Sequence, residues 1–153
     1  MSDGAKQAAF STIHDDDTPL YGHPALLVCG LSPDDQHRLL DLLAGLTENS
    51  LRVIFITLSD RDKPVGKLMT QKHLANLGQT SQSPGVIIVA GLAHQTLFQI
   101  MQRYRREALP RVMWATLTPY NETWPLSQLL AELTIERETL RRTSQSSPEG
   151  ERA

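Results

Sequence analysis

Four short apolar runs, rich in branched side chains, constrain the fold of this chain more than any other feature. They are Ala25–Val28, Val53–Thr57, Val86–Ala90 and Val112–Leu117. Each run has the length of a β-strand and is continuous rather than alternating, which is typical of strands covered on both faces. Stretches with helical spacing separate them. The order strand, helix, strand, helix, repeated once, therefore predicts an α/β fold with a mostly parallel sheet between two layers of helices.

The first helix has the clearest start, with Ser32 as N-cap, Pro33 at the first helical position and Asp34 in the first turn. Apolar residues at helical spacing predict the buried faces of three helices: Leu39, Leu42, Leu43 and Leu46; Leu97, Ile100, Met101 and Tyr104; Leu126, Leu129, Leu130 and Leu133. A fourth helix over Val65–Leu77 has a poorer apolar stripe, and Gly78 is suited to cap its end.

The two halves of the chain resemble each other. Three residues at the end of the first strand, Val28, Gly30 and Leu31, have matches 61 positions later in Val89, Gly91 and Leu92. Three residues of the second strand, Val53, Thr57 and Leu58, have matches 59 positions later in Val112, Thr116 and Leu117. Either an internal repeat or shared strand and turn preferences explains these matches.

A repeat would restrict the topology of the sheet. Right-handed crossovers on opposite faces, with the first and third strands side by side, predict a flavodoxin-like three-layer arrangement with strand order 2-1-3-4. Ligands of open α/β sheets bind at the switch point beyond the carboxyl ends of the strands. Four loops then share one rim: 31–33, 59–64, 92–95 and 118–124.

The 153 residues fit one domain with a single hydrophobic core. Residues 1–20 and 143–153 are polar and predict disordered tails. The folded unit is predicted over 21–142, with possible repeats at 25–78 and 85–142.

Net charge argues against two classes of binding partner, and the absence of targeting signals bears on the location of the protein in the cell. The net charge is −2 and the central unit is close to neutral, which argues against binding to nucleic acid or to an anionic membrane surface. No apolar run approaches the roughly 20 residues of a membrane span. The single Cys29 cannot form an internal disulfide and no signal peptide is evident, so a cytoplasmic protein is expected.

Seven arginines lie near two predicted helix ends: Arg103, Arg105, Arg106, Arg111, Arg137, Arg141 and Arg142. They either complement the helix dipoles or form a shared patch for nucleic acid. The interleaved glutamates and the shortage of aromatic residues favour the first alternative.

The predicted rim is richest in functional groups at Thr118–Trp124. Thr118 and Asn121 offer hydroxyl and amide groups beside the flat apolar surface of Trp124, and we take these three as candidate ligand or partner residues. A structural interpretation competes, because Asn121 is an ordinary turn residue and Trp124 is placed to clamp the following helix to the sheet.

His94 is a further candidate, since it follows the third strand at the start of a helix, where the dipole lowers its pKa and favours anions. The remaining histidines show no metal-ligand spacing. The charged turn Asp60–Lys63 is either solvated or able to bind a cation or a phosphate, and Cys29 is expected to be a buried, inert thiol. Phosphate-loop, dinucleotide and nucleophile-elbow motifs are absent, so no cofactor is predicted.

From Gly85 onward the chain resembles a family of small bacterial proteins catalogued as domain of unknown function 3783. The resemblance is carried by VIIVAGL at Val86–Leu92, LTPYNETW at Leu117–Trp124 and LSQLLAEL at Leu126–Leu133. The family shows a similar strand ending in Gly-Leu, a Thr-Pro-x-Asn-x-x-Trp run and a leucine-rich helix.

The family pattern transfers to Thr118, Pro119, Asn121 and Trp124 of this chain. It often has a lysine where Trp114 stands here, which weakens the idea of a charged catalytic group. The resemblance implies a bacterial origin and a fold, and it implies no activity.

Two hypotheses about function follow. The first is a non-enzymatic α/β module that binds a protein partner or a small ligand at the rim with Thr118, Asn121 and Trp124. The second is a small-molecule enzyme acting on an anionic substrate, with His94 as acid or base close to Asn121. Exposed edge strands would also allow a homodimer.

Overall fold

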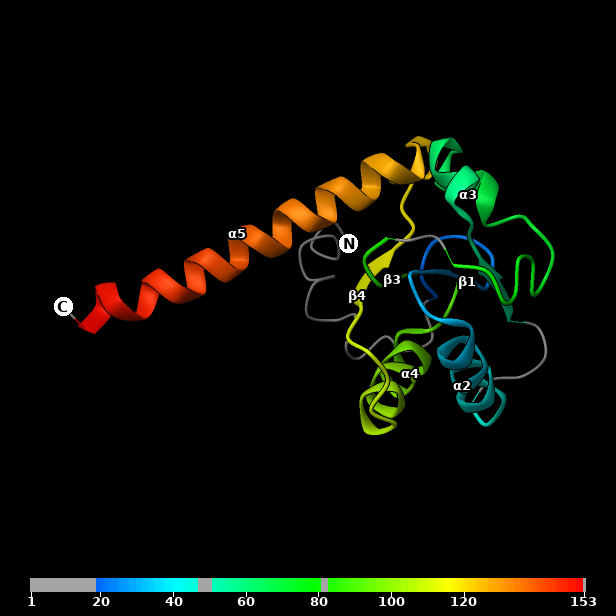
Figure 1. Cartoon of the computed structure of the whole chain (residues 1–153), viewed down its shortest axis with the longest axis horizontal. Helices are drawn as coiled ribbons and strands as arrows, with labels where there is room; N and C mark the ends of the chain where they lie inside the picture. Colours follow the sequence, from blue (N-terminus) through cyan, green and yellow to red (C-terminus); the bar gives the residue numbers. More distant parts are fainter. Residues whose placement is uncertain (1–18, 47–50, 81–82, 153) are drawn as a thin grey trace, which may run out of the picture.

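The computed structural model of the chain describes residues 19–46, 51–80 and 83–152 (Figure 1). Most of the tail predicted at residues 1–20 therefore lies outside the described residues. Within it, Pro19 forms an antiparallel bridge with Ala93, and the Leu20 N–H donates a hydrogen bond of 2.7 Å to the Leu92 carbonyl.

A four-stranded sheet forms the centre of the molecule. Its strands are β1 (Ala25–Cys29), β2 (Arg52–Phe55), β3 (Val86–Ala90) and β4 (Met113–Thr116). Their order is β2-β1-β3-β4, which confirms the predicted order, and the pairs β1–β2 and β3–β4 are parallel as expected.

The central pair of strands differs from the prediction, because β1 and β3 are antiparallel. In the register of this pair Ala25 lies opposite Ala90 and Cys29 lies opposite Val86. The two βαβ units are thus related by an approximate two-fold rotation about an axis normal to the sheet. Such a rotation keeps both right-handed crossovers on the same face rather than on opposite faces.

The helices are distributed accordingly. The crossover helices α2 (Pro33–Ala44) and α4 (His94–Arg106) lie side by side on one face, while α3 (Val65–Leu68) and α5 (Leu126–Arg152) cover the other face (Figure 1). Two apolar clusters, one under each pair of helices, divide the inward and outward side chains of the strands between them.

The predicted common rim is therefore wrong. Loops 31–33 and 59–64 follow strands that end at one end of the sheet, whereas loops 92–95 and 118–124 follow strands that end at the other. No switch point joins the carboxyl ends of β1 and β3. The second and fourth loops meet instead over the α3/α5 face, where Pro64 and Pro125 form an antiparallel bridge.

The first crossover helix begins as predicted. Ser32 is the N-cap of α2, its side chain accepts a hydrogen bond from the Asp35 N–H at 3.2 Å, and Pro33 opens the helix. The helix predicted over Val65–Leu77 is wrong beyond Leu68, because α3 is a single turn. Leu74 and Asn76 have φ of 68° and 61°, a left-handed conformation that a helix excludes.

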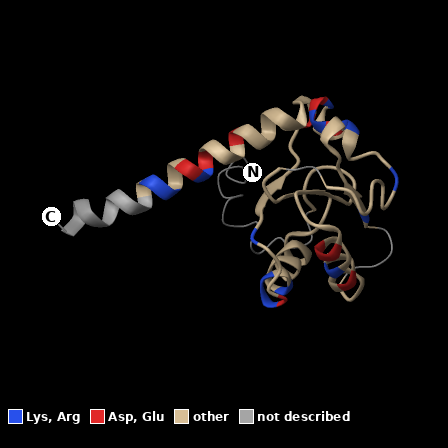
Figure 2. Ribbon diagram, in the orientation of Figure 1, with Lys and Arg blue, Asp and Glu red and all other residues tan. Residues whose placement is uncertain are grey.

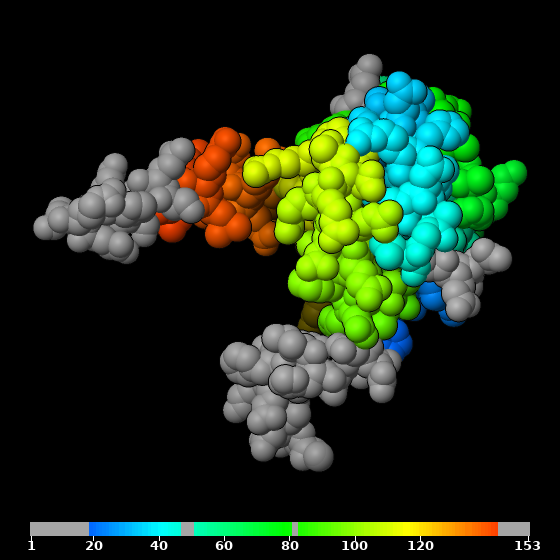
Figure 3. All heavy atoms as spheres, turned by 90° about the horizontal axis from the view of Figure 1, so that it is seen from below, coloured from blue at the N-terminus to red at the C-terminus, as the bar shows by residue number. Residues whose placement is uncertain are grey.

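Helix α5 continues to Arg152, past the predicted end of the folded unit at residue 142. Its first turns pack on the sheet through Leu126, Leu129 and Leu130. The rest of the helix projects away from the body of the molecule (Figures 1 and 3). Both acidic and basic residues occur on the coloured part of α5, and basic residues gather at the far end of α4 (Figure 2).

The strands and crossover helices of the two halves begin at one constant offset. β3 begins 61 positions after β1, and α4 begins 61 positions after α2. Val53 lies opposite Leu26, and Trp114 lies opposite Ile87. The counterpart of Val53 is therefore Trp114, also 61 positions later, and not Val112 as the sequence comparison suggested.

Candidate functional site

The predicted loop Thr118–Trp124 is held together by its own polar side chains. The Asn121 Oδ1 accepts a hydrogen bond from the Thr118 N–H at 2.9 Å, and the Asn121 Nδ2 donates to the Thr116 carbonyl at 3.1 Å. The Thr118 hydroxyl accepts from the N–H groups of Tyr120 (3.2 Å) and Asn121 (3.0 Å). The functional groups of Thr118 and Asn121 thus close the turn that leads into α5.

Trp124 and His94 lie on different layers of the fold. Trp124 is half-buried against the apolar cluster beneath α3 and α5, and its carbonyl accepts a hydrogen bond from the Val65 N–H. His94 is the half-buried first residue of α4, the helix that covers the opposite face. A catalytic pair of His94 and Asn121 stays a prediction.

The corresponding turn of the first half contains Asp60, which is buried with 4% of its surface exposed. The Asp60 carboxylate accepts hydrogen bonds from the Thr57 N–H at 2.9 Å and from the Lys63 ammonium at 3.1 Å. Burial alone would raise the pKa of Asp60, but these donors outweigh it and hold the pKa below its ordinary value. Asp60 thus acts as the anchor of this turn.

A hollow of about 450 Å³ lies beside α3, where it is lined by residues from both halves. The Tyr21 hydroxyl donates to both carboxylate oxygens of Glu122 at 3.0 and 2.9 Å, and this hydrogen bond raises the pKa of Tyr21. Glu122 is the member of the predicted loop that reaches this hollow, and Arg52 lines it from the start of β2.

The two outer strands of the sheet, β2 and β4, differ in whether their outward backbone groups are hydrogen bonded. Along β2, the irregular segment His73–Asn76 pairs with the strand: the Leu74 N–H donates to the Val53 carbonyl at 2.7 Å, and the Phe55 N–H donates to the Ala75 carbonyl at 3.0 Å. The Val53 N–H donates to the His73 Nδ1 at 3.0 Å. The outward polar groups of β2 are therefore satisfied.

Among the described residues, the edge of β4 has no such cover. Met113 and Leu117 donate their N–H groups to the Gly85 and Val89 carbonyls of the neighbouring strand, so the N–H groups of Trp114 and Thr116 point outward. No residue in the described part of the chain pairs with the N–H or C=O of Trp114 or with the N–H of Thr116. The Thr116 carbonyl accepts the side-chain bond from Asn121. β4 thus presents an open edge at the position where β2 is covered.

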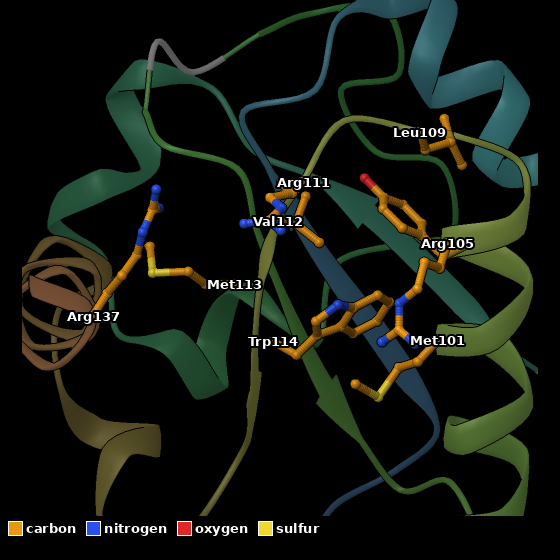
Figure 4. Close-up of a pocket in the computed structure, with 9 residues that line it drawn as sticks. Met101, Arg105, Leu109, Arg111, Val112, Met113, Trp114 and Arg137 are labelled. Carbon is orange, nitrogen blue, oxygen red and sulfur yellow. The ribbon is translucent and has the colours of Figure 1, made fainter. Parts of the chain in front are cut away.

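A groove of about 480 Å³ runs along this edge between α4 and α5 (Figure 4). The described residues that line it are Met101, Tyr104, Arg105, Leu109, Arg111, Val112, Met113, Trp114 and Arg137. Figure 4 shows Trp114 directed toward α4 and Met113 directed toward Arg137 on α5, as alternate residues of a strand should be. We call this combination of the β4 edge and its lining residues the β4 groove.

The aromatic floor of the groove is fixed in place. The Tyr104 and Trp114 rings meet edge to face, with centroids 5.5 Å apart and planes at 86°. The Tyr104 hydroxyl donates to the Pro110 carbonyl, and burial raises the pKa of Tyr104 to about 12. Tyr104 is therefore a neutral packing residue that orients Trp114.

Three arginines of the groove have no anionic partner among the described residues. Arg105, Arg111 and Arg137 are exposed, and none of them forms an ion pair with a described residue, whereas Arg103 pairs with Glu107 and Arg141 with Glu138. The described lining contains no acidic residue. The sequence placed these arginines at two separate helix ends, and only the arrangement of α4, β4 and α5 brings them together.

Residues 85–140 match a domain of unknown function, DUF3783. The match covers β3, α4, β4 and the packed part of α5, as the sequence resemblance indicated, and it includes every residue that lines the β4 groove. No curated protein and no solved structure matches the chain.

The described residues include neither a metal-binding cluster nor a membrane-spanning helix. They contain no group of three or more histidine, cysteine or carboxylate side chains placed to hold a metal ion. None of the helices within them has the length and apolar character needed to cross a bilayer.

Proposed function

We propose that the chain is a non-enzymatic binding module whose partner protein adds an extended segment to the open edge of β4. In this proposal residues 25–78 and 85–142 are two copies of one unit. The first copy covers its own edge strand, and the second leaves the same edge available. The observation that carries the proposal is the contrast between Val53, whose outward N–H and C=O are both hydrogen bonded, and its counterpart Trp114, whose groups are open.

The first half supplies the precedent for what occupies such an edge. His73–Asn76 is a short, irregular segment, and yet its backbone groups and two side chains satisfy the outward groups of β2. In the second half the corresponding residues, 134–137, belong to α5 and lead away from the edge. A segment from another protein can make the same main-chain hydrogen bonds, which is the mode of recognition known as strand addition.

Helix α5 extends the proposed binding surface. The stripe that packs on the sheet, ending at the half-buried Leu133, continues at helical spacing as Arg137 and Leu140, and Leu140 is 67% exposed. At 1.5 Å per residue, Leu140 lies about 10 Å beyond Leu133, or roughly two strand spacings. A strand added to β4 would be covered by this part of α5.

In this proposal the candidate residues Thr118, Asn121 and Trp124 position α5 and do not contact the partner. Their loop joins β4 to α5 and fixes where α5 leaves the sheet. The partner contacts are assigned to β4 and to the residues that line the groove, and the loop is assigned to their positioning.

A library of displayed linear peptides, selected on the whole chain, tests the proposal. We expect bound peptides to slow amide hydrogen exchange at Trp114 and Thr116. We also expect Thr116→Pro to reduce binding at least tenfold, because proline removes the outward N–H while remaining compatible with an edge strand. Thr116→Val is the matched control, since it keeps that N–H and should keep the affinity.

Peptides that bind Thr116→Pro as well as the unchanged chain, or that protect amides elsewhere, would place the partner site away from β4. A selection without binders would count against the proposal as well. The melting temperatures of the two variants, which we expect to be close, show that loss of binding does not come from loss of the fold.

A further inference from the structure

Resting on the proposed strand addition, we infer that the segment bound in the β4 groove is acidic. The groove holds the guanidinium groups of Arg105, Arg111 and Arg137 without a carboxylate among its described lining residues. Unpaired cations around an apolar floor favour a partner of opposite charge, both in the rate of encounter and in the choice of partner.

The three arginines reach both faces of an incoming strand. Arg105 lies on α4 on the side of Trp114, while Arg137 lies on α5 on the side of Met113 (Figure 4). Side chains of an extended segment alternate between these two sides. Carboxylates at successive positions would therefore meet Arg105 on one face and Arg137 on the other, and Arg111, just before β4, can pair with an acidic residue near one end of the segment.

The aromatic surface of the groove lies on the side of α4. Trp114, Met101 and the ring of Tyr104 form the floor next to α4. An apolar side chain on that face would cover Trp114, which is half-buried without it. The segment that fits is thus an acidic strand with at least one apolar residue facing α4.

Charge argues against a second copy of this chain as the occupant. Pairing β4 with β4 of another molecule would bring six unpaired arginines to one junction, and like charges across a strand pair are destabilising. An acidic partner neutralises the same residues.

Three synthetic peptides test whether the segment that binds β4 must be acidic. Each carries a single valine, and its other residues are all glutamate, all glutamine or all lysine, so that the varied side chain falls on both faces of an added strand. Their affinity for the whole chain is measured by fluorescence anisotropy at low and high salt. Amide exchange at Trp114 and Thr116 reports whether each peptide occupies the edge. We expect the glutamate peptide to bind most tightly, to protect both amides and to weaken as salt increases.

Variants of the groove test the role of each cation. Arg105→Gln, Arg111→Gln and Arg137→Gln should each weaken the glutamate peptide by about two- to five-fold, the effect of one exposed ion pair. They should leave the glutamine peptide unchanged. Arg106→Gln is the control, because Arg106 is an exposed arginine of the same helix outside the groove.

Failure of the acidic-partner inference can be distinguished from failure of the proposed strand addition. If the glutamine or lysine peptide protects Trp114 and Thr116 as well as the glutamate peptide does, the acidic partner is wrong and strand addition stands. If no peptide protects them, strand addition fails too. A chain that sedimentation equilibrium shows to be dimeric, with both amides protected before any peptide is added, would identify a second copy as the occupant and overturn the inference.

Discussion

Asp60 and Asn121 stand 61 positions apart, and each side chain accepts a hydrogen bond of 2.9 Å from the N–H of a threonine three residues earlier. They differ in what they donate. The Asn121 amide also donates to the Thr116 carbonyl, whereas in the first half the corresponding Phe55 carbonyl receives the amide of Asn76, from the segment that covers β2. Asn121 thus performs two tasks that the first half divides between Asp60 and Asn76.

This division predicts unequal effects of exchanging the two side chains. Asn121→Asp keeps the acceptor for the Thr118 N–H but leaves the Thr116 carbonyl without its donor. It should therefore lower the free energy of unfolding by about 1 kcal/mol. Asp60→Asn keeps the acceptor for Thr57 and loses the ion pair with Lys63, so its cost should be smaller. Urea unfolding of the two variants measures the difference. Equal losses would contradict the assignment of a second task to Asn121.

Asp60 should also make the free energy of unfolding depend on pH in the acidic range. Its pKa in the folded state lies below the ordinary value of 3.8, so as pH falls the unfolded chain takes up the proton first. The stabilising contribution of Asp60 is complete well above pH 3.8 and is lost as pH falls through the lower, folded-state pKa. Unfolding free energies measured across this range should decrease more steeply for the unchanged chain than for Asp60→Asn.

Parallel pairing within each half could be predicted from the sequence, because a helical stretch between two apolar runs implies a crossover. The relative direction of the halves could not. After β2 the chain returns through α3 and then makes a further pass beside β2, from His73 to Asn76, so that β3 starts at the end of the sheet where β1 finishes. That extra pass is short and has left-handed residues, so it carries no strand pattern.

The candidate site was predictable only in part for the same reason. The Thr118–Trp124 run stood out because its residue types suit a turn, and a turn is what its hydrogen bonds form. The β4 groove depends on which strand lies at the edge and on where α5 goes after Leu133. Arg105 and Arg137 are far apart in the chain, and no local pattern connects them.

Gly91 is predicted to be among the least replaceable residues. It has φ of +71°, and an added Cβ would lie 2.4 Å from the backbone of His23 and Pro24. Gly78 has φ of +92° with no atom within 4 Å of such a Cβ. Gly78→Ala should therefore cost only the backbone strain, about 1 kcal/mol, while Gly91→Ala should cost considerably more, because the pairing of residues 19–22 with the end of β3 must shift. Thermal unfolding of the two variants compares these costs. Similar losses of stability would contradict the close approach of Gly91 to the backbone of His23 and Pro24.

Cys29 should react only when the chain unfolds. The thiol is fully buried in β1, and burial raises its pKa to about 12 although the charge of Arg61 opposes the shift. Both the thiolate fraction and access are therefore minimal in the folded state. Alkylation by iodoacetamide should follow the unfolding rate as denaturant is added. Rapid labelling without denaturant would show that β1 opens locally.

The open edge makes a prediction that needs no partner. Val53 and Phe55 donate their N–H groups to His73 and Ala75, whereas the counterparts Trp114 and Thr116 face outward without acceptors among the described residues. Amide exchange in the isolated chain should be slow at the first pair and faster by orders of magnitude at the second, because exchange requires opening of the hydrogen bond. The inward-facing N–H of Met113 serves as an internal control, since it is bonded to Gly85 in the same strand. Fast exchange at Met113 as well would mean that β4 detaches as a whole, and slow exchange at all three would mean that the edge is already covered in solution.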